Sequence, residues 1–405
     1  MPSFAEQARS EATRLLEALI RIRSPNPPGD EDRIVDLVEP YLADVGLHSI
    51  RVPLAEGRSS VVARVKGANP GSLVLCGHLD TVNADPSQWD TDPWTPHRRG
   101  DRLYGLGSAD MKSGVAVLMT VVSHLARGST RPPCDIVLAL TADEERGYQG
   151  AASIAEAGLI DDARLLLIAE PTGGRAYIGQ KGELWVECLF SGRAAHGSIP
   201  ESGASALLPG CDFSLRLAEE AKRFPEIHGR GRTSLNVGTM QGGCQVNIVP
   251  DRARIELDLR VVSASERDRV VARIEELGRQ VATEWKVEFG YRVINDRAPI
   301  VSPTEDPWIA RFLCAHSETT SRAQPHEIAP YSTDAVAVVP RLQTPVIIYG
   351  PGRIEQAHQP NEYLELASLT EALDVIGRFV GLDGCCDRPE EAQARSHEDH
   401  KREVT

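Results

Sequence analysis

Four short apolar runs, each followed by a polar side chain, constrain the fold of this chain more than any other feature. The runs cover residues 73–76, 136–140, 165–168 and 346–349. Each run is nearly all apolar, which is typical of strands covered on both faces in a parallel sheet. Helical stretches separate the runs, and this alternation predicts an α/β fold with a mixed, mostly parallel sheet flanked by helices. We expect those helices at residues 4–22, 31–45, 114–126, 151–157 and 365–380.

The side chains that follow the apolar runs are acids and histidines. His78 follows the first run, Glu144 and Glu145 follow the second, Glu170 follows the third and His358 follows the fourth. In open parallel sheets, ligands bind beyond the carboxyl ends of the strands. We therefore expect these side chains, which are far apart in the sequence, to meet at one end of the sheet.

Such a cluster predicts a metal site. Carboxylates packed together repel one another and raise each other's pKa, and a divalent cation removes this repulsion by supplying positive charge. Imidazole together with carboxylate suits zinc, while cobalt, nickel or manganese can also be accommodated. Another acid, Asp110, lies in a glycine-rich stretch directly before the apolar helix expected at residues 114–126. The number of candidate ligands favours two ions, as in hydrolases with paired metals. The candidate ligands are His78, Asp110, Glu145, Glu170 and His358.

Two further acids are candidates for roles beside the metals. His78 and Asp80 are two residues apart on an extended segment, so they point the same way, and Asp80 can accept a hydrogen bond from the distal ring nitrogen of His78. Glu144 and Glu145 are adjacent and cannot both face one metal in the same way. One of them can bind metal while the other stays free as a general base on the attacking water.

The middle of the chain has a different pattern. Longer alternating strands are expected at residues 184–190, 234–240 and 254–261, with helices at residues 204–224 and 265–284. This pattern predicts a small α+β unit, and the buried-strand pattern resumes after it, so we interpret it as an insertion. The predicted organisation is a catalytic domain in two parts, residues 1–180 and 297–385, an inserted domain at residues 181–296 and a disordered tail at residues 386–405.

The composition excludes several classes of protein. Lys plus Arg number 44 against 58 Asp plus Glu, which gives a formal net charge of −14. A general binder of nucleic acid or of an anionic membrane needs the opposite sign. Residues 1–21 lack the basic start and apolar block of a secretion signal. The eight cysteines, spread over 405 residues, are not a disulfide framework. We therefore expect a cytoplasmic protein that binds neither nucleic acid nor membrane.

The order of the motifs resembles that of a known family. Residues 77–82, 103–112, 142–145 and 169–172, and then residues 350–352 with His358, follow the motifs of M20-type metallopeptidases. This group includes acetylornithine deacetylases, succinyl-diaminopimelate desuccinylases, aminoacylases and glutamate carboxypeptidases. The resemblance implies a two-zinc site, and the ligand chemistry also allows cobalt or manganese. By this resemblance Asp110 bridges the ions, His78 and Glu170 hold one of them, and Glu145 and His358 hold the other.

The resemblance also implies roles for other residues. Glu144 is the general base and acid, Asp80 orients His78, and the inserted domain is a lid and a dimerisation surface. His196 matches a lid histidine that stabilises the tetrahedral oxyanion, although a glycine-flanked histidine in a turn is otherwise unremarkable. The residues that match substrate contacts are Asn247, Arg260, Ser332, Thr333 and Gly350.

Two of these substrate contacts have other interpretations. Asn247 could simply cap a turn. Arg260 suits a free carboxylate, but it could equally pair with Asp258 or Glu256 on its own strand.

We interpret the chain as a dinuclear-metal amidohydrolase that removes an acetyl- or succinyl-type N-acyl group from an amino acid, similar to acetylornithine deacetylase. Residues 105–107 and 142–145 favour that part of the family. The alternatives are an M20 dipeptidase or carboxypeptidase, a member that acts on an unusual amide or amine, and a non-catalytic metal-binding or assembly protein. An intact Glu144 argues against the last, because a binder needs no free base. The implied partners are a small N-acyl amino acid or dipeptide and a second copy of the chain.

Overall fold

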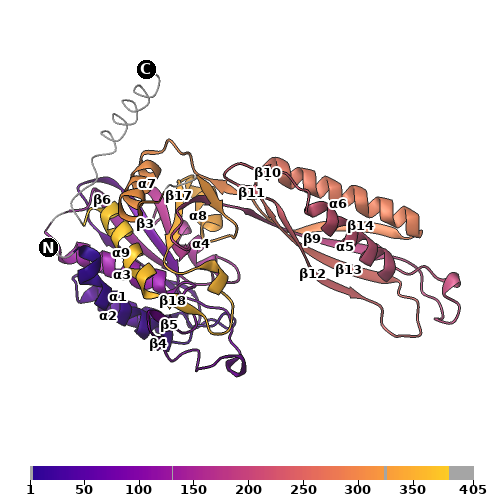
Figure 1. The fold of residues 1–405 in the computed structure, drawn as a ribbon, viewed down its shortest axis with the longest axis horizontal. Coiled ribbons are helices and arrows are strands. Elements are labelled where there is room, and N and C mark those ends of the chain that lie inside the picture. The colour runs from indigo at the N-terminus through magenta and orange to yellow at the C-terminus, as the bar shows by residue number, and fades with distance from the viewer. Residues whose placement is uncertain (1–2, 130, 323–325, 383–405) are drawn as a thin grey trace, which may run out of the picture. The chain divides into compact units, whose positions relative to one another are not determined.

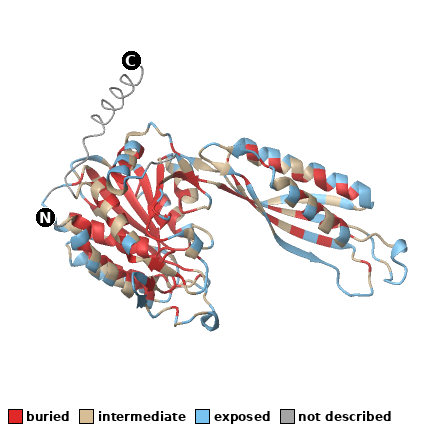
Figure 2. Cartoon of the chain, in the orientation of Figure 1, coloured by how far each residue is buried: buried red, intermediate tan, exposed pale blue. Residues whose placement is uncertain are grey.

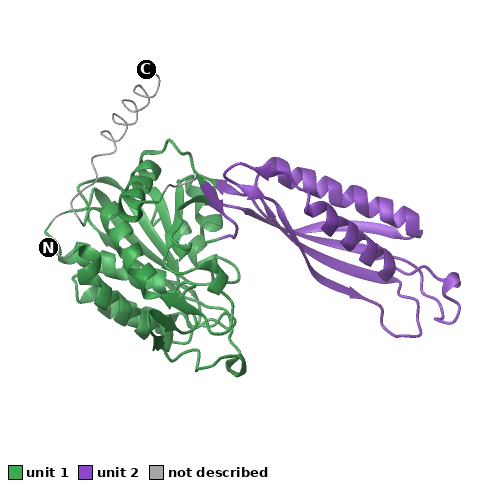
Figure 3. Cartoon of the chain, viewed as in Figure 1, with its two compact units in different colours: residues 1–179, 301–326, 333–405 green, residues 180–300, 327–332 purple. Residues whose placement is uncertain are grey.

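The computed structural model describes residues 3–129, 131–322 and 326–382 and divides the chain into two compact units (Figures 1 and 3). Unit 1 contains residues 1–179, 301–326 and 333–405, and unit 2 contains residues 180–300 and 327–332. The tail expected to be disordered, residues 386–405, lies outside the described residues. None of the described helices is long and apolar enough to cross a bilayer.

Unit 1 is built around a sheet whose central strands are parallel. Within this unit the strand order is β1-β2-β6-β3-β7-β17-β8, with β3 parallel to both β6 and β7, and β17 parallel to β7. The four apolar runs form β6, β3, β7 and β17, so the predicted α/β class with a mostly parallel sheet is confirmed. The strands are β1 (Ser49–Ala55), β2 (Arg58–Val65), β3 (Asn69–His78), β4 (His97–Arg99), β5 (Arg102–Tyr104), β6 (Cys134–Thr141), β7 (Ala163–Pro171), β8 (Tyr177–Gln180), β17 (Val346–Gly350) and β18 (Tyr363–Glu365), with β15 (Ile300–Val301) at a boundary between the units.

The helices of unit 1 cover the sheet. Helix α3 is buried along nearly its whole length, as its apolar sequence predicts (Figure 2). It approaches β7 closely, because a Cβ atom at Gly114 would lie 2.1 Å from the carbonyl oxygen of Ala169. Helix α1 starts with a capping box between Ser3 and Glu6, which satisfies backbone N–H groups of its first turn. The helices are α1 (Phe4–Arg21), α2 (Asp32–Ala43), α3 (Lys112–Arg127), α4 (Gln149–Glu156), α7 (Pro307–Thr320), α8 (Ala335–Leu342) and α9 (Leu366–Val380).

Unit 2 has its own sheet and its own core. The antiparallel strand order is β12-β13-β9-β14, and alternate residues of β9 and β13 are buried with the apolar sides of α5 and α6. Residues 327–332 join this unit because Ile328 donates its N–H to the Gly229 carbonyl oxygen and Ala329 accepts from the Lys181 N–H. The elements are β9 (Gly182–Ser191), α5 (Leu207–Ala221), β10 (Glu226–Ile227), β11 (Gly231–Arg232), β12 (Ser234–Gly242), β13 (Arg252–Val261), α6 (Ala264–Trp285), β14 (Glu288–Arg297) and β16 (Glu327–Ala329).

Candidate metal centre

The strand ends of unit 1 bring the predicted ligands together. His78 is the last residue of β3 and pairs in register with Thr141, the last residue of β6, three residues before Glu144. Glu170 lies near the end of the adjacent parallel strand β7. His358 follows β17, which pairs with β7 on its other side. Because these parallel strands point the same way, their carboxyl ends meet at one end of the sheet.

Two groups of three ligand atoms form at this point, and Asp110 belongs to both. The first group is His78, Asp110 and Glu170, and the second is Asp110, Glu145 and His358. Oδ1 of Asp110 lies 3.2 Å from Nε2 of His78, and Oδ2 lies 3.4 Å from Nε2 of His358. The two oxygens of one carboxylate therefore face two different histidines.

The distances and the donor atoms of both groups suit zinc. Donor atoms around one tetrahedral zinc ion stand about 3.4 Å apart, because zinc binds nitrogen and oxygen at about 2.0 to 2.2 Å. Nε2 of His78 is 3.7 Å from Oε1 of Glu170, and Nε2 of His358 is 3.1 Å from Oε2 of Glu145. Oε1 of Glu145 is buried and has no hydrogen-bond partner among the described residues. These side chains fit a pair of divalent cations.

The acids of the cluster have perturbed pKa values without a cation. Burial raises the pKa of Glu170 well above its ordinary value, and the charge of Asp110 raises it further. Burial also raises the pKa of Glu145, although its hydrogen bond to His358 opposes the shift. That same hydrogen bond raises the pKa of His358 to about 9. Burial is the largest single effect on His78 and lowers its pKa. The hydrogen bond to Asp110 and the charges of the surrounding carboxylates together outweigh burial and hold the pKa well above the ordinary value. The cluster therefore retains protons that a metal ion would displace on binding.

Glu144 belongs to neither group of ligands. Burial raises its pKa well above the ordinary value. The charge of His78 opposes this shift, and the carboxylates of Glu170 and Glu145 reinforce it. A carboxyl group that lies beside the candidate ligands but outside both groups can accept a proton and return it.

Asp80 does not orient His78 through its carboxylate as the sequence suggests. Nδ1 of His78 lies 2.9 Å from the backbone carbonyl oxygen of Asp80 but 3.7 Å from its carboxylate. The carboxylate instead accepts the backbone N–H of Glu144 at 3.1 Å and of Glu145 at 3.2 Å, together with the side-chain amide of Asn26 at 2.9 Å. These donors bind both carboxylate oxygens, while the His78 ring faces the backbone oxygen. Asp80 thus holds the segment that carries Glu144 and Glu145.

Comparison with known proteins identifies the family. The model of peptidase family M20/M25/M40 matches residues 74–381 of the 405 residues. The chain belongs to this family. It is therefore a hydrolase of amide bonds in a family that depends on metal ions, and the resemblance of the sequence motifs is confirmed.

Relatives and solved structures extend the comparison. An acetylornithine deacetylase of Myxococcus xanthus is 30% identical over 84% of this chain and 86% of that protein. A probable succinyl-diaminopimelate desuccinylase of Staphylococcus aureus is 25% identical over 93% of this chain and 97% of that protein. The solved structure of a Staphylococcus aureus tripeptidase has a TM-score of 0.78 at 19% identity, over 92% of this chain and 98% of the other. At this level of identity the likeness concerns the fold alone.

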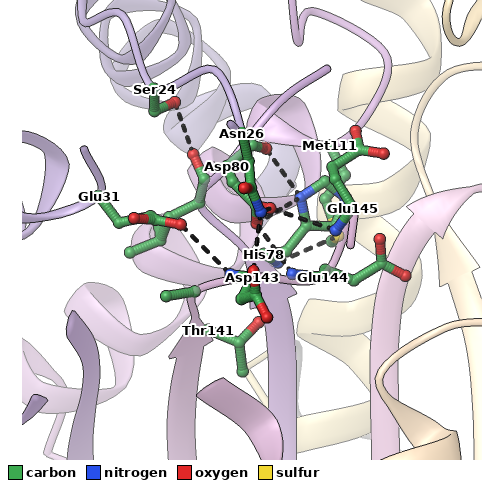
Figure 4. A network of polar contacts seen from close by, with 12 residues as sticks. Ser24, Asn26, Glu31, His78, Asp80, Met111, Thr141, Asp143, Glu144 and Glu145 are labelled. Carbon is green, nitrogen blue, oxygen red and sulfur yellow. Dashed lines mark hydrogen bonds and ion pairs between the residues drawn. The ribbon is translucent and has the colours of Figure 1, made fainter. Parts of the chain in front are cut away.

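A buried polar network adjoins the candidate metal centre (Figure 4). The side-chain amide of Asn26 donates to Asp80 and to Asp143, both at 2.9 Å, and so separates two carboxylates that would repel each other. Arg58 donates to Glu31 at 2.9 Å and to Asp143 at 3.1 Å. Asp143 directly precedes Glu144, so the network fixes the start of the segment that carries Glu144 and Glu145. No pattern in the sequence indicates this network.

We predict that Arg58→Met lowers the free energy of unfolding of the metal-free protein by about 3 to 5 kcal/mol, because it leaves a buried acid without its partner. The Glu31 side chain is 0% exposed in its pair with Arg58. The matched control is Arg33→Met, which removes an exposed pair with Asp30 at 3.5 Å and is expected to cost less than about 0.5 kcal/mol. Urea unfolding followed by fluorescence measures both, and equal costs would contradict the prediction.

The predicted lid residues lie in unit 2. His196 is exposed, and its Nδ1 accepts the Ser198 N–H at 3.2 Å, so in the neutral ring Nε2 carries the proton and is a donor. The Gly197 N–H donates to the Asn247 carbonyl oxygen at 2.7 Å, which brings the segments of His196 and Asn247 together.

The predicted carboxylate contact, Arg260, is already paired within unit 2. Its Nε lies 3.1 Å from Asp258, the partner that the sequence left open, and its Nη1 lies 3.5 Å from Oγ of Ser332. Nη1 is also 3.9 Å from the buried carboxylate of Glu183. Arg260 therefore lies between two acids and the Ser332 hydroxyl.

The two remaining predicted substrate contacts are buried in unit 1. Oγ1 of Thr333 accepts the Ala335 N–H at 3.2 Å, at the start of α8. A Cβ atom on Gly350 would lie 2.2 Å from the Ala169 carbonyl oxygen. The glycine therefore permits the close approach of β17 to β7, whatever contact its backbone makes with a substrate.

Proposed function

We propose that this M20 chain is a dinuclear-metal amidohydrolase that removes an acetyl- or succinyl-type acyl group from the nitrogen of an amino acid. The observation that carries the proposal is the shared Asp110, whose two oxygens face His78 and His358 while Glu144 stays outside both ligand groups. The acyl-group assignment is supported by the 30% identical acetylornithine deacetylase.

The side chains proposed to hold the two ions fall into three sets. His78 and Glu170 hold one ion, Glu145 and His358 hold the other, and Asp110 is shared. When bound, a metal pair of this kind polarises the amide carbonyl and lowers the pKa of water. Zinc suits this mixed set of imidazoles and carboxylates, and cobalt or manganese are alternatives.

Glu144 carries the proton in the proposed reaction. It accepts a proton from the attacking water as the water oxygen bonds to the amide carbonyl carbon. It then returns that proton to the nitrogen as the carbon–nitrogen bond breaks, which gives a carboxylic acid and a free amine. His196 is proposed to donate its Nε2–H to the oxygen that gains negative charge. Asp80 keeps the backbone of Glu144 and Glu145 in place during both transfers.

Metal removal tests this proposal directly. We expect dialysis against a strong chelator to abolish amide hydrolysis and two equivalents of zinc or cobalt per chain to restore it, because both ligand groups must be filled. Elemental analysis and kcat/KM measure the two quantities. Full turnover by protein that elemental analysis finds free of metal would contradict the proposal.

A substrate panel tests the acyl group. N-acetyl amino acids, N-succinyl amino acids and dipeptides are compared by kcat/KM with zinc and with cobalt. We expect the N-acyl amino acids to be preferred, whereas a preference for dipeptides would favour a peptidase of the same family. A flat profile without turnover would reject both.

We also propose that unit 2 forms a lid and a homodimer, as the resemblance implies. Light scattering of the purified protein measures the mass of the particle and so tests the homodimer.

A further inference from the structure

One buried carboxylate accepts hydrogen bonds from the backbone of the loop that carries Asp110. Glu362 is 1% exposed, and its Oε1 accepts the N–H of Ala109 at 2.7 Å and of Asp110 at 3.0 Å. Its Oε2 accepts the N–H of Gly107 at 2.9 Å, and its backbone oxygen accepts the N–H of Gly105 at 3.1 Å. A single residue therefore binds this loop at four backbone positions.

The position of Glu362 in the chain links this loop to a second ligand. Glu362 lies four residues after His358, on the segment that brings the His358 ring toward Asp110. For Asp110 to serve both ligand groups, its two oxygens must stay directed at His78 and at His358 together. A small rotation of its backbone would lose one of these two alignments.

We infer that Glu362 is a positioning residue for the metal pair, which fixes the Asp110 carboxylate between the two ions and sets its spacing from His358. The inference rests on the proposed function. Outer partners that orient metal ligands typically contribute 10- to 100-fold to metal affinity. Glu362 binds the backbone of one ligand and lies on the same segment as another, so its removal is expected to weaken the binding of both ions.

A merely structural role for Glu362 would have a different signature. If the carboxylate only stabilised the loop, its removal would weaken the metal-free fold and leave zinc affinity unchanged. Asp135 offers a matched control, because it also accepts a backbone N–H, that of Gly67 at 2.9 Å. Asp135 pairs in register with Ser72 at the start of β3, at the opposite end of that strand from His78.

The experiment compares wild type, Glu362→Gln, Glu362→Ala and Asp135→Asn as metal-free full-length proteins. Zinc is titrated in competition with a chromophoric chelator, cobalt binding is followed by its absorption spectrum, and urea unfolding is measured without metal. We expect Glu362→Ala to weaken zinc binding by about 10- to 100-fold and to change the cobalt spectrum. Glu362→Gln keeps the volume and one acceptor oxygen, so we expect a loss of about 10-fold. Asp135→Asn is expected to lower the urea midpoint of unfolding but to leave the zinc affinity at its wild-type value.

The outcomes separate this inference from the proposed function. Wild-type zinc affinities and cobalt spectra in both Glu362 variants would overturn the inference and leave the dinuclear centre standing. A wild-type protein that binds neither zinc nor cobalt would overturn the proposed function and the inference together. If Glu362→Ala does not fold, the result for Glu362→Gln decides, because the amide has nearly the size of the acid it replaces.

Discussion

Replacement of Glu144 by glutamine is expected to lower kcat by about 10³- to 10⁴-fold, while KM and zinc content stay close to the wild-type values. Glutamine has nearly the same size as glutamate but can neither accept the proton of water nor return it to the leaving amine. Because Glu144 belongs to neither ligand group, the change leaves every proposed metal ligand in place.

The fold should tolerate this substitution. Burial raises the pKa of Glu144 well above its ordinary value, which means that the site disfavours a negative charge there. A neutral amide of nearly the same size suits this site, so we expect the variant to keep the wild-type fold. The control is Glu156→Gln, which changes an exposed acid at the end of α4 and should keep kcat within about twofold, since exposed substitutions have small effects. More than a tenth of wild-type kcat in the zinc-loaded Glu144 variant would reject Glu144 as the base.

The sequence pattern predicts the centre of unit 1 because strand order and ligand position are coupled. Each apolar run is long enough to be recognised as a buried strand, and the segment that follows each run must emerge at the same end of a parallel sheet. His78, Glu170 and His358 could therefore be grouped before their distances were known. Their donor atoms do lie within a few ångströms of Asp110 or of one another.

The residues that support the centre could not be predicted in this way. Glu362 and Gly107 are 255 residues apart, and Asn26 and Asp143 are 117 apart, in segments without any shared pattern. Glu362 binds backbone N–H groups, which every residue but proline carries, so no partner side chain marks the contact in the sequence. The same limit applies to Asp80. Its spacing in the sequence suggests a contact with His78, but its carboxylate accepts the backbone N–H groups of Glu144 and Glu145.

Residues 327–332 illustrate a related limit. They belong to unit 2 through backbone hydrogen bonds to Gly229 and Lys181, although 26 residues of unit 1 separate them from residues 180–300. The strand in this segment, β16, has only three residues, which is too short for a recognisable alternation of apolar and polar side chains. Ser332 reaches Arg260 through this return of the chain to unit 2.

Replacement of Asp110 by asparagine is expected to weaken the binding of both metal ions at once, by at least about 100-fold each. We expect it to reduce kcat/KM below about 10⁻³ of the wild-type value. Asparagine offers one oxygen and one amide nitrogen, and the amide nitrogen is a donor that does not bind a cation. The residue could therefore serve at most one ion where Asp110 faces both histidines.

Glu170→Gln provides the matched comparison, because Glu170 belongs only to the group with His78 and Asp110. We expect this variant to bind one ion more weakly and to bind the other with near wild-type affinity, since Glu145 and His358 are untouched. Calorimetric titration of the metal-free proteins with zinc, checked by elemental analysis after gel filtration, resolves one affected site from two. Two tightly bound zinc ions in Asp110→Asn, or equal losses at both sites in Glu170→Gln, would contradict a shared Asp110. The difference between the two variants is the direct measure of bridging, because both exchange one carboxylate for an amide and differ only in how many ligand groups that carboxylate joins.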